Sequence, residues 1–165
     1  MRNTTLLLLA ILSLTAFSCQ GQVRSSAYRS MLKRLLGHTV PELTVKQATA
    51  TPTTTFLDAR EPAEYEVSHI SGSKLVGYDR FDLNSVASIP KETPIIVYCS
   101  VGYRSEKIAE KLIAAGYTQV SNLYGGIFEW VNEGQTVVNT QGNTDKVHAY
   151  NRTWGVWLRK GKKVY

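Results

Sequence analysis

The sequence predicts an α/β fold, in which a mainly parallel central sheet is covered by helices on both faces. Short apolar segments rich in Val, Ile and Leu alternate along the chain with segments of helical periodicity, and glycines or prolines separate them. This alternation is typical of parallel strands joined by right-handed helical crossovers. A chain of 165 residues is long enough for one domain with its own core, so we expect a single domain with an N-terminal signal and helix and a C-terminal extension.

Residues 1–18 are expected to form a secretory signal peptide. One arginine precedes the apolar run Leu6–Leu14, which is too short to span a bilayer, and small residues follow it. The segment "TAFSC" resembles a relaxed bacterial lipoprotein box, which predicts lipidation of Cys19, although Ala16 and Ser18 also suit ordinary signal cleavage. We therefore expect an exported protein, periplasmic or on the outer surface, held at a bacterial membrane by its lipid anchor.

The net charge of +6 comes largely from basic residues near the two ends of the chain. A solvated basic surface explains them, and attraction to anionic lipid headgroups, at about 1 kcal/mol per basic residue close to the surface, is the alternative in an anchored protein. Nucleic acid is not an expected partner, because export removes the chain from it and no recognition motif is present.

Residues 19–43 are expected to provide the anchor, a linker and a short amphipathic helix. Apolar residues recur there at spacings of three and four, and the pattern ends at Gly37. The apolar positions are Tyr28, Met31, Leu32, Leu35 and Leu36. We expect this helix to pack on the domain rather than lie at the membrane.

The first half of the domain is expected to alternate short helices with short strands. A weak helix runs from a Thr44 cap to Ala50, and a strand follows in "TTFLD". The next helix, from Glu61 to about Ser68, has a proline near its start and glutamates in its early turns, which suits a helix N-terminus. A short strand in "KLVGY" and a helical turn in "DLNSVASI" complete this half.

The second half of the domain begins with the buried strand "PIIVYC". A helix from Arg104 follows, with apolar residues along one face and Gly116 where a left-handed cap belongs. The segment "QVSNL" is the next strand, and "GGIFEWVNEG" starts and ends a last helix with glycines. The whole domain is expected to span residues 44–134.

Residues 135–165 are expected to form an extension that is partly docked on the domain. The segment is rich in Asn, Thr and Gly, yet a disordered tail rarely holds so many aromatic residues. The aromatic residues are Tyr150, Trp154, Trp157 and Tyr165. The spacing of the two tryptophans suits one helix face, which most simply indicates packing.

Cys99 is the candidate catalytic residue. It ends a predicted strand just before a helix, and ligands in an open α/β sheet bind beyond the carboxyl ends of the strands. Loop N–H groups and a helix N-terminus favour an anion there, so we expect the thiolate to be stabilised. Gly102 allows the backbone to turn its N–H groups inward, Arg104 adds a planar fork of donors, and Ser105 supplies one more donor.

An inert buried cysteine is the simpler explanation of a lone cysteine after a strand. The combination of cysteine, glycine and arginine in one strand–loop–helix favours a nucleophile instead. If Cys19 is acylated, Cys99 is the sole thiol and no internal disulfide forms.

Two motifs of the chain resemble a rhodanese-like domain. They are "LDAREPAEYEVSHISGSKLV" and "VYCSVGYRSEKIAEKLIAAGYTQVSNLYGGIFEW". The resemblance implies a single-domain α/β sulfurtransferase, in which Cys99 becomes a persulfide and passes sulfane sulfur to a nucleophile. It also implies a substrate-binding loop around the cysteine, made of Ser100, Val101, Gly102, Tyr103, Arg104 and Ser105. Asp58 and Arg60 are then expected to brace this loop, and His69 to be mostly structural.

The length of the loop distinguishes two chemistries within the wider family. From Cys99 to Arg104 the pattern is C-x4-R, the size found in sulfurtransferases, whereas related phosphatases and arsenate reductases use C-x5-R. The shorter loop therefore favours sulfur chemistry, and the resemblance implies thiosulfate sulfurtransferase activity. A sulfur carrier or redox sensor without turnover is the alternative, and oxyanion reduction or phosphatase activity ranks below both.

The expected partners are a small anionic sulfur donor such as thiosulfate, and an acceptor that is cyanide, an external thiol or a thioredoxin-like protein. The acceptor has to come from outside because the domain offers no second thiol. No cofactor is expected, and three scattered histidines with one free thiol offer no ligand spacing for a metal.

Overall fold

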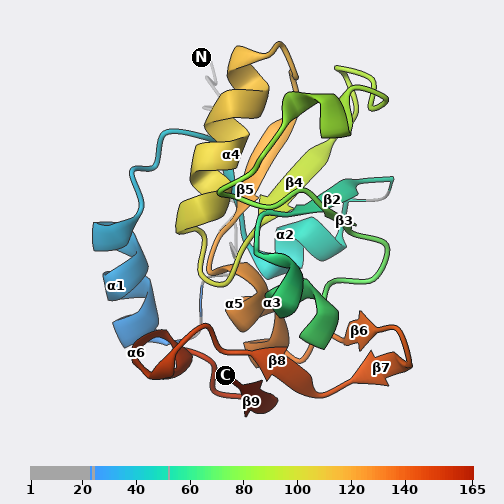
Figure 1. The fold of residues 1–165 in the computed structure, drawn as a ribbon. Coiled ribbons are helices and arrows are strands. Elements are labelled where there is room, and N and C mark those ends of the chain that lie inside the picture. Colours follow the sequence, from blue (N-terminus) through green and yellow to red (C-terminus); the bar gives the residue numbers. More distant parts are fainter. Residues whose placement is uncertain (1–22, 24, 52) are drawn as a thin grey trace, which may run out of the picture.

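The computed structural model describes residues 23, 25–51 and 53–165, and it confirms the predicted α/β class. Its central sheet has five strands in the order β1-β5-β4-β2-β3, and every pairing in it is parallel (Figure 1). The predicted signal peptide at 1–18 and the predicted lipidation site Cys19 lie outside the described residues. None of the described helices is long and apolar enough to cross a membrane.

The elements follow the predicted order through the domain. The sheet strands are β1 (Glu42–Leu43), β2 (Thr55–Asp58), β3 (Lys74–Leu75), β4 (Ile95–Tyr98) and β5 (Val120–Leu123). The helices are α1 (Ser26–Leu35), α2 (Val45–Thr49), α3 (Pro62–Val67), the 3-10 turn η1 (Leu83–Val86), α4 (Tyr103–Ala114), α5 (Gly126–Asn132) and α6 (Arg152–Gly155). The extension adds β6 (Val137–Asn139), β7 (Gly142–Thr144), β8 (Lys146–His148) and β9 (Lys162–Val164).

The two faces of β4 contribute side chains to two apolar cores. Ile96 and Tyr98 lie in a core shared with α1, α2, α5 and the extension, whereas Ile95 and Val97 lie in a core shared with α4 and η1. Successive side chains of a strand point to opposite faces, so a strand that is apolar at every position belongs in the middle of a covered sheet. β4 is accordingly buried along its whole length between β2 and β5.

Local sequence signals set several of the helix ends. Thr44 caps α2 in a capping box with Gln47, as its position predicts, and Pro62 occupies the first turn of α3. Gly116 follows α4 with a φ of 91°, a conformation that glycine adopts without strain. α1 ends at Leu35, slightly before the predicted stop at Gly37.

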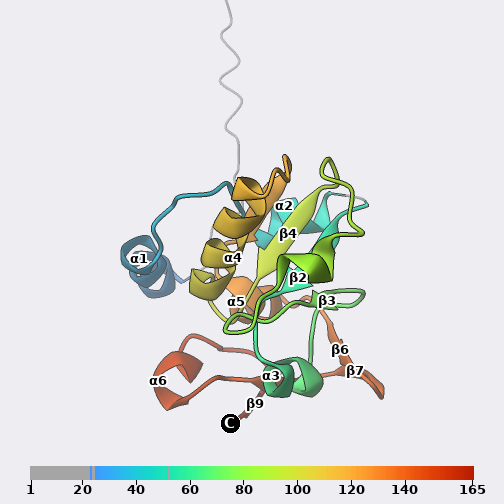
Figure 2. The same cartoon turned by 45° about the horizontal axis from the view of Figure 1, so that its top comes forward.

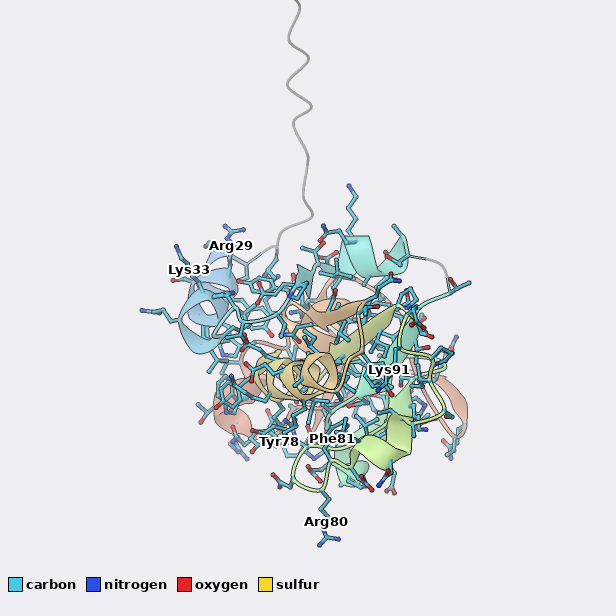
Figure 3. All side chains as sticks on the ribbon, turned by 90° about the horizontal axis from the view of Figure 1, so that it is seen from above. Arg29, Lys33, Tyr78, Arg80, Phe81 and Lys91 are labelled. Atoms are coloured by element: carbon cyan, nitrogen blue, oxygen red, sulfur yellow. The ribbon has the colours of Figure 1, made fainter. Side chains whose placement is uncertain are left out.

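Helix α1 packs its apolar face on the domain. Tyr28 and Leu32 are buried, and the Tyr28 hydroxyl donates to the carbonyl of Gly125 at 2.8 Å. Arg29 and Lys33 lie on the outer side of the helix (Figure 3). The apolar residues of this helix therefore form core, as the spacing predicts, and its basic residues lie on the outer side.

The extension is docked on the edge of the domain where the sheet strands end (Figures 1 and 2). Its backbone bridges to the domain between His69 and Val138, with N–H to carbonyl distances of 2.8 and 2.9 Å. The Trp157 ring stacks on Tyr28 at 5.3 Å between centroids, and Leu158 is fully buried in the same core. The four strands of the extension were not predicted, because their short segments lack an apolar alternation and form only by pairing with one another.

We predict that Leu158→Ala lowers the free energy of unfolding of the whole domain by about 3 kcal/mol, because it leaves a cavity in a shared core. Val156→Ala is the matched control, since Val156 is 60% exposed and its truncation should change stability by less than about 0.5 kcal/mol. Denaturant unfolding followed by tryptophan fluorescence measures both variants. A wild-type midpoint for Leu158→Ala would mean that the extension unfolds separately from the domain.

Candidate functional site

Cys99 lies directly after β4, at the carboxyl end of the central strand of the sheet. Only 1% of its surface is exposed, and the backbone N–H of Gly102 donates to its sulfur at 3.1 Å. Gly102 has a φ of 121°, a backbone conformation that residues with a side chain rarely adopt, and it is the N-cap of α4. The sulfur thus lies within a tight turn that leads into the positive end of a twelve-residue helix.

The carbonyl groups of Cys99, Ser100 and Gly102 in this turn accept hydrogen bonds from neighbouring elements. The N–H groups of Ile127 and Phe128 in α5 donate to the carbonyls of Cys99 at 2.9 Å and Ser100 at 3.2 Å. The side-chain amide of Asn122 donates to the carbonyl of Gly102 at 3.0 Å. Because these acceptors are paired elsewhere, the turn directs a backbone donor, and not a carbonyl, to the sulfur.

This arrangement needs α5 to approach the turn very closely. A side chain at Gly126 would place its Cβ 2.4 Å from the carbonyl oxygen of Cys99 and 2.6 Å from that of Ser100. Gly126 also has a φ of 57°. The second glycine of "GGIFEW" is therefore required by contact with the turn as well as by its backbone conformation.

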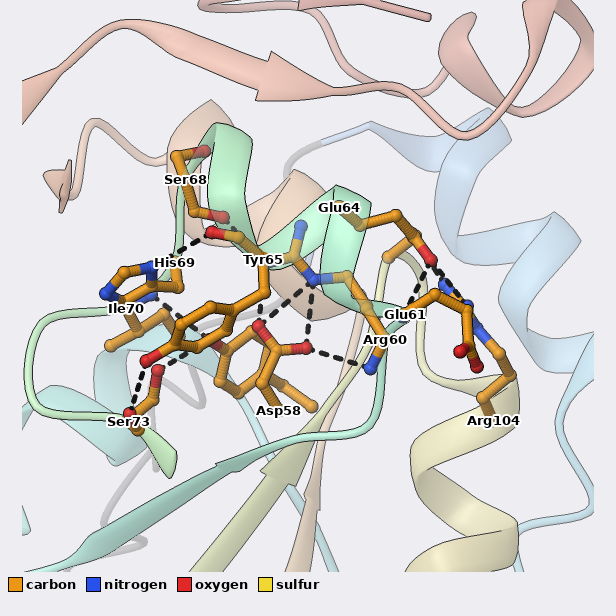
Figure 4. Close-up of polar contacts among 12 residues, drawn as sticks. Asp58, Arg60, Glu61, Glu64, Tyr65, Ser68, His69, Ile70, Ser73 and Arg104 are labelled. Atoms are coloured by element: carbon orange, nitrogen blue, oxygen red, sulfur yellow. Dashed lines mark hydrogen bonds and ion pairs between the residues drawn. The ribbon is translucent and has the colours of Figure 1, made fainter. Parts of the chain in front are cut away.

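Arg104 is bound through both ends of its guanidinium group. Nη1 donates to Oε2 of Glu64 at 2.7 Å, and Nη2 donates to Oε1 at 2.8 Å and to the Ser100 hydroxyl at 3.0 Å (Figure 4). The Ser100 hydroxyl in turn donates to Oε1 of Glu64 at 3.0 Å. The guanidinium fork of Arg104, expected to be part of the substrate-binding loop, is therefore directed, through these two nitrogens, at a carboxylate of the protein.

The pair is largely withdrawn from water, and its two pKa values move apart. Burial by itself would raise the pKa of Glu64, but the hydrogen bonds and charge of Arg104 outweigh burial and lower that pKa. For Arg104 the signs are reversed: burial by itself would lower its pKa, but the hydrogen bonds with Glu64 and the nearby Cys99 sulfur outweigh burial and raise that pKa. Both groups stay charged, with side-chain exposures of 14% for Arg104 and 5% for Glu64.

Sequence reasoning assigned Glu64 only to the N-terminal turn of a helix and missed it as a site residue. Its carboxylate also accepts from the backbone N–H of Glu61 at 3.1 Å, so it caps α3 and binds the loop at the same time. One feature of the predicted fold does indicate that Glu64 lies near the site. Helix α3 starts right after β2, whose carboxyl end lies beside that of β4 in a parallel sheet, so the first turn of α3 has to lie near Cys99.

Asp58 and Arg60 form a fully buried ion pair beneath α3 (Figure 4). Arg60 Nη2 lies 2.6 Å from Asp58 Oδ2 and donates to the carbonyl of Ser68 at 2.7 Å. Arg60 Nη1 and the Ser68 hydroxyl have no hydrogen-bond partner among the described residues. The two side chains join the end of β2 to the end of α3, and neither lines the cavity at Cys99.

His69 lies at the far end of α3 from Glu64. Its ring stacks on Tyr65 at 3.8 Å between centroids, with Nδ1 3.0 Å from the Tyr65 carbonyl. The backbone of His69 carries the bridge to Val138 of the extension. This placement keeps the imidazole outside the cavity at Cys99.

A cavity of about 220 Å³ opens at Cys99. It is lined by Cys99, Ser100, Val101, Tyr103 and Arg104 of the loop and by Leu35, Tyr150 and Trp154. Ser105 does not line it, because the Ser105 hydroxyl lies 2.7 Å from Asn122 Oδ1 and 3.1 Å from the Gly102 carbonyl. The resemblance implies that Ser105 contacts substrate, whereas its hydrogen bonds are with the base of the loop. Leu35, Tyr150 and Trp154 line the cavity although no sequence pattern connects them with it.

Within the part of the chain that the structure describes, no three His, Cys, Asp or Glu side chains gather closely enough to hold a metal ion.

Comparison with known proteins agrees with this geometry. The model of the rhodanese-like domain family matches residues 42–133, which is more than half of the chain. The chain is 29% identical over 81 residues to the probable adenylyltransferase/sulfurtransferase MoeZ of Mycobacterium tuberculosis, covering 48% of this chain and 21% of that protein. It is 30% identical over 105 residues to the tRNA uridine(34) hydroxylase of Yersinia pestis, covering 61% of this chain and 30% of that protein. The chain thus spans less than a third of these curated relatives.

Solved structures show the same fold. The BH2092 protein of Bacillus halodurans matches with a TM-score of 0.56 and 25% identity, over 70% of this chain and 86% of that one. The thiosulfate sulfurtransferase of Pseudomonas aeruginosa matches in fold with a TM-score of 0.58 and 24% identity, over 70% of this chain and 23% of that one. With a cysteine in a six-residue loop at the end of the central strand and a family model matched across that strand and loop, this chain belongs to the rhodanese-like domain family.

Proposed function

We propose that this protein is a sulfurtransferase that carries sulfane sulfur as a persulfide on Cys99. The observation that supports this most directly is the Gly102 N–H, 3.1 Å from the Cys99 sulfur at the start of α4. A backbone donor and a helix N-terminus favour a negative charge on sulfur, which both the attacking thiolate and the persulfide carry. Membership of the rhodanese-like domain family supports the proposal, since a relative of this chain is a probable adenylyltransferase/sulfurtransferase.

The proposed cycle has two half-reactions, with thiosulfate as the model donor. The Cys99 thiolate attacks the outer sulfur, a new S–S bond forms, and the original S–S bond breaks with its electron pair leaving on sulfite. Cyanide or an external thiol then takes the outer sulfur and restores the thiolate. Such a cycle follows ping-pong kinetics, because the first product leaves before the acceptor binds.

Within this cycle we assign Arg104 as a positioning residue. Its Nη1 and Nη2 bond to Glu64 and Ser100, so Arg104 ties the loop after Cys99 to helix α3. Its positive charge also lies beside the cavity. Loop N–H groups then provide the direct contacts to the departing anion.

A sulfur carrier or redox sensor without turnover is the second candidate. The observation that favours it is the 1% exposure of Cys99, which limits access for a small acceptor. A stable persulfide that neither cyanide nor thiols discharge would support this role. Phosphatase or arsenate reductase activity is disfavoured by the six-position C-x4-R loop.

We predict that incubation with thiosulfate adds the mass of one sulfur atom to the protein, and that cyanide removes it with formation of thiocyanate. Cys99→Ser should abolish both the mass increase and the turnover, because the hydroxyl cannot carry the sulfur. Cys19→Ala is the control and should behave as wild type. Mass spectrometry of the intact protein and a thiocyanate assay on the same sample measure this, and a Cys99→Ser protein that retains turnover would contradict the assignment.

We predict that Glu64→Gln lowers the free energy of unfolding by about 3 kcal/mol at neutral pH, because it leaves the largely buried Arg104 without its counter-charge. The folded-state pKa of Glu64 is lowered, so its contribution is complete above the unfolded value of about 4.3 and is lost as pH falls through the folded value. The stability difference between wild type and variant should therefore shrink in acid.

The control for this prediction is Glu66→Gln, since Glu66 is an exposed glutamate on the same helix. Its denaturation midpoints should follow those of the wild type at every pH. A Glu64→Gln difference that stays constant from pH 7 into the acid range would show that the ion pair is not its source.

We also propose that the chain is exported and anchored through Cys19. The apolar run Leu6–Leu14 and the "TAFSC" segment support this proposal. The full-length chain expressed in a bacterium should partition into the detergent phase of a Triton X-114 extract, and Cys19→Ala should move it to the aqueous phase. Equal partitioning of the two proteins would contradict an anchor on Cys19.

A further inference from the structure

The cavity at Cys99 is completed by residues from outside the family's shared span. Leu35 comes from the end of α1, and Tyr150 and Trp154 come from the extension, whereas the family model covers residues 42–133. These three side chains line the same cavity as the loop that contains the thiol. The part of the cavity lining that lies outside the span of the family model is therefore an apolar wall, defined here as Leu35, Tyr150 and Trp154.

The chemistry of this wall does not suit a small dianion. Its members are aliphatic or aromatic, and Val101 and Tyr103 extend the same character on the loop side. Among the residues that the structure describes, Arg104 is the one charged residue that lines the cavity, and its Nη1 and Nη2 are already bonded to Glu64 and Ser100. A thiosulfate ion would satisfy the donors near the sulfur and leave the wall in contact with water.

The wall is held in place by specific local contacts. Tyr150 has a φ of 62°, an uncommon conformation for a residue with a side chain, and its N–H donates to Nδ1 of His148 at 3.1 Å. Asn151 then caps α6 by accepting from the N–H of Trp154 at 3.0 Å. These contacts direct the Tyr150 ring to the cavity, and the residue as a whole is 49% exposed. The Arg104 guanidinium lies 5.2 Å from the centroid of the ring.

We propose that the site selects sulfane-sulfur donors that carry an apolar group, and that Tyr150 and Trp154 of the extension determine this specificity. This inference rests on the proposed sulfur transfer to Cys99. An aryl or alkyl group attached to the donor would lie against the wall while the sulfane sulfur reaches the thiol. The gain comes from removing apolar surface of both ligand and wall from water, together with ring–ring contact.

A thiosulfonate is the simplest donor of this class, and its reaction balances without any other reagent. The Cys99 thiolate attacks the sulfane sulfur of benzenethiosulfonate, and a Cys–S–S bond forms as the bond between sulfane and sulfonyl sulfur breaks. The electron pair leaves on benzenesulfinate. One negative charge resides on the protein and one on the small molecule both before and after the step.

The experiment compares kcat/KM for benzenethiosulfonate and methanethiosulfonate with the same acceptor. The two donors share their charge and reacting group and differ in the apolar group, so the ratio of their kcat/KM values reports contact with the wall. Comparing this ratio between variants cancels their intrinsic difference in reactivity. The wild type should prefer the aryl donor, and the preference should fall about tenfold in Trp154→Ala.

Two substitutions at Tyr150 separate loss of the ring from loss of folding. Tyr150→Gly removes the ring at a φ that glycine adopts without strain, so its fold should be retained while the aryl preference falls about tenfold. Tyr150→Phe keeps the ring and should keep the preference. Val156→Ala, in the same segment but outside the cavity lining, should leave the ratio at its wild-type value.

The outcomes distinguish this inference from the function on which it rests. Persulfide formation on Cys99 with an aryl preference that neither Tyr150→Gly nor Trp154→Ala reduces would overturn the specificity assignment and leave sulfur transfer intact. A rise in aryl preference on removing the Tyr150 ring would overturn it as well, because the ring would then obstruct the donor. Failure of every donor to form a persulfide on Cys99 would overturn the proposed function and this inference with it.

Discussion

The site depends on the close backbone contact between the turn after β4 and the first residues of α5. The carbonyls of Cys99 and Ser100 accept from the N–H groups of Ile127 and Phe128, and this contact is possible only because residue 126 has no Cβ. With those carbonyls paired, the turn can present the Gly102 N–H to the sulfur. A glycine far from the thiol in sequence thereby determines which backbone groups the thiol meets.

A second constraint connects the loop to α3 through charge. The carboxylate of Glu64 accepts from Arg104, Ser100 and the backbone of Glu61, so one side chain satisfies donors from the loop and from its own helix. Buried charges are tolerated when they are paired and hydrogen-bonded, and the Glu64–Arg104 pair is held by two hydrogen bonds between its charged groups. Arg104 is consequently part of the frame of the loop, and in the proposed sulfur transfer the direct contacts to an anionic donor fall to backbone groups.

The extension changes the lining of the cavity that the loop faces. In the span that the family shares, the cavity has the thiol, the loop and Arg104. In this chain the end of α1 and the start of α6 add Leu35, Tyr150 and Trp154, and they are supported by a core that includes Tyr28, Trp157 and Leu158. Folding of the extension and the shape of the site are therefore coupled through the same apolar packing.

Much of the fold follows from local signals in the sequence. The apolar run at Ile95–Tyr98 predicted a buried strand, Gly116 predicted the end of α4, and the glycines of "GGIFEW" predicted the start of α5, and all three are confirmed. The two-residue strand β1 and the strands of the extension were missed, because such short segments form only when a partner strand supplies their hydrogen bonds.

The sequence by itself determined the alternation of strands and helices, the position of a lone thiol at a strand end and the six-residue length of its loop, since each depends on neighbours along the chain. Only the tertiary structure decided that Glu64 pairs with the Arg104 guanidinium, that Ser105 contacts Asn122, and that Tyr150 and Trp154 line the cavity. These are contacts between segments distant in sequence. Their partners are chosen by packing and by the pairing of buried polar groups, and neither of these leaves a periodic pattern in the chain.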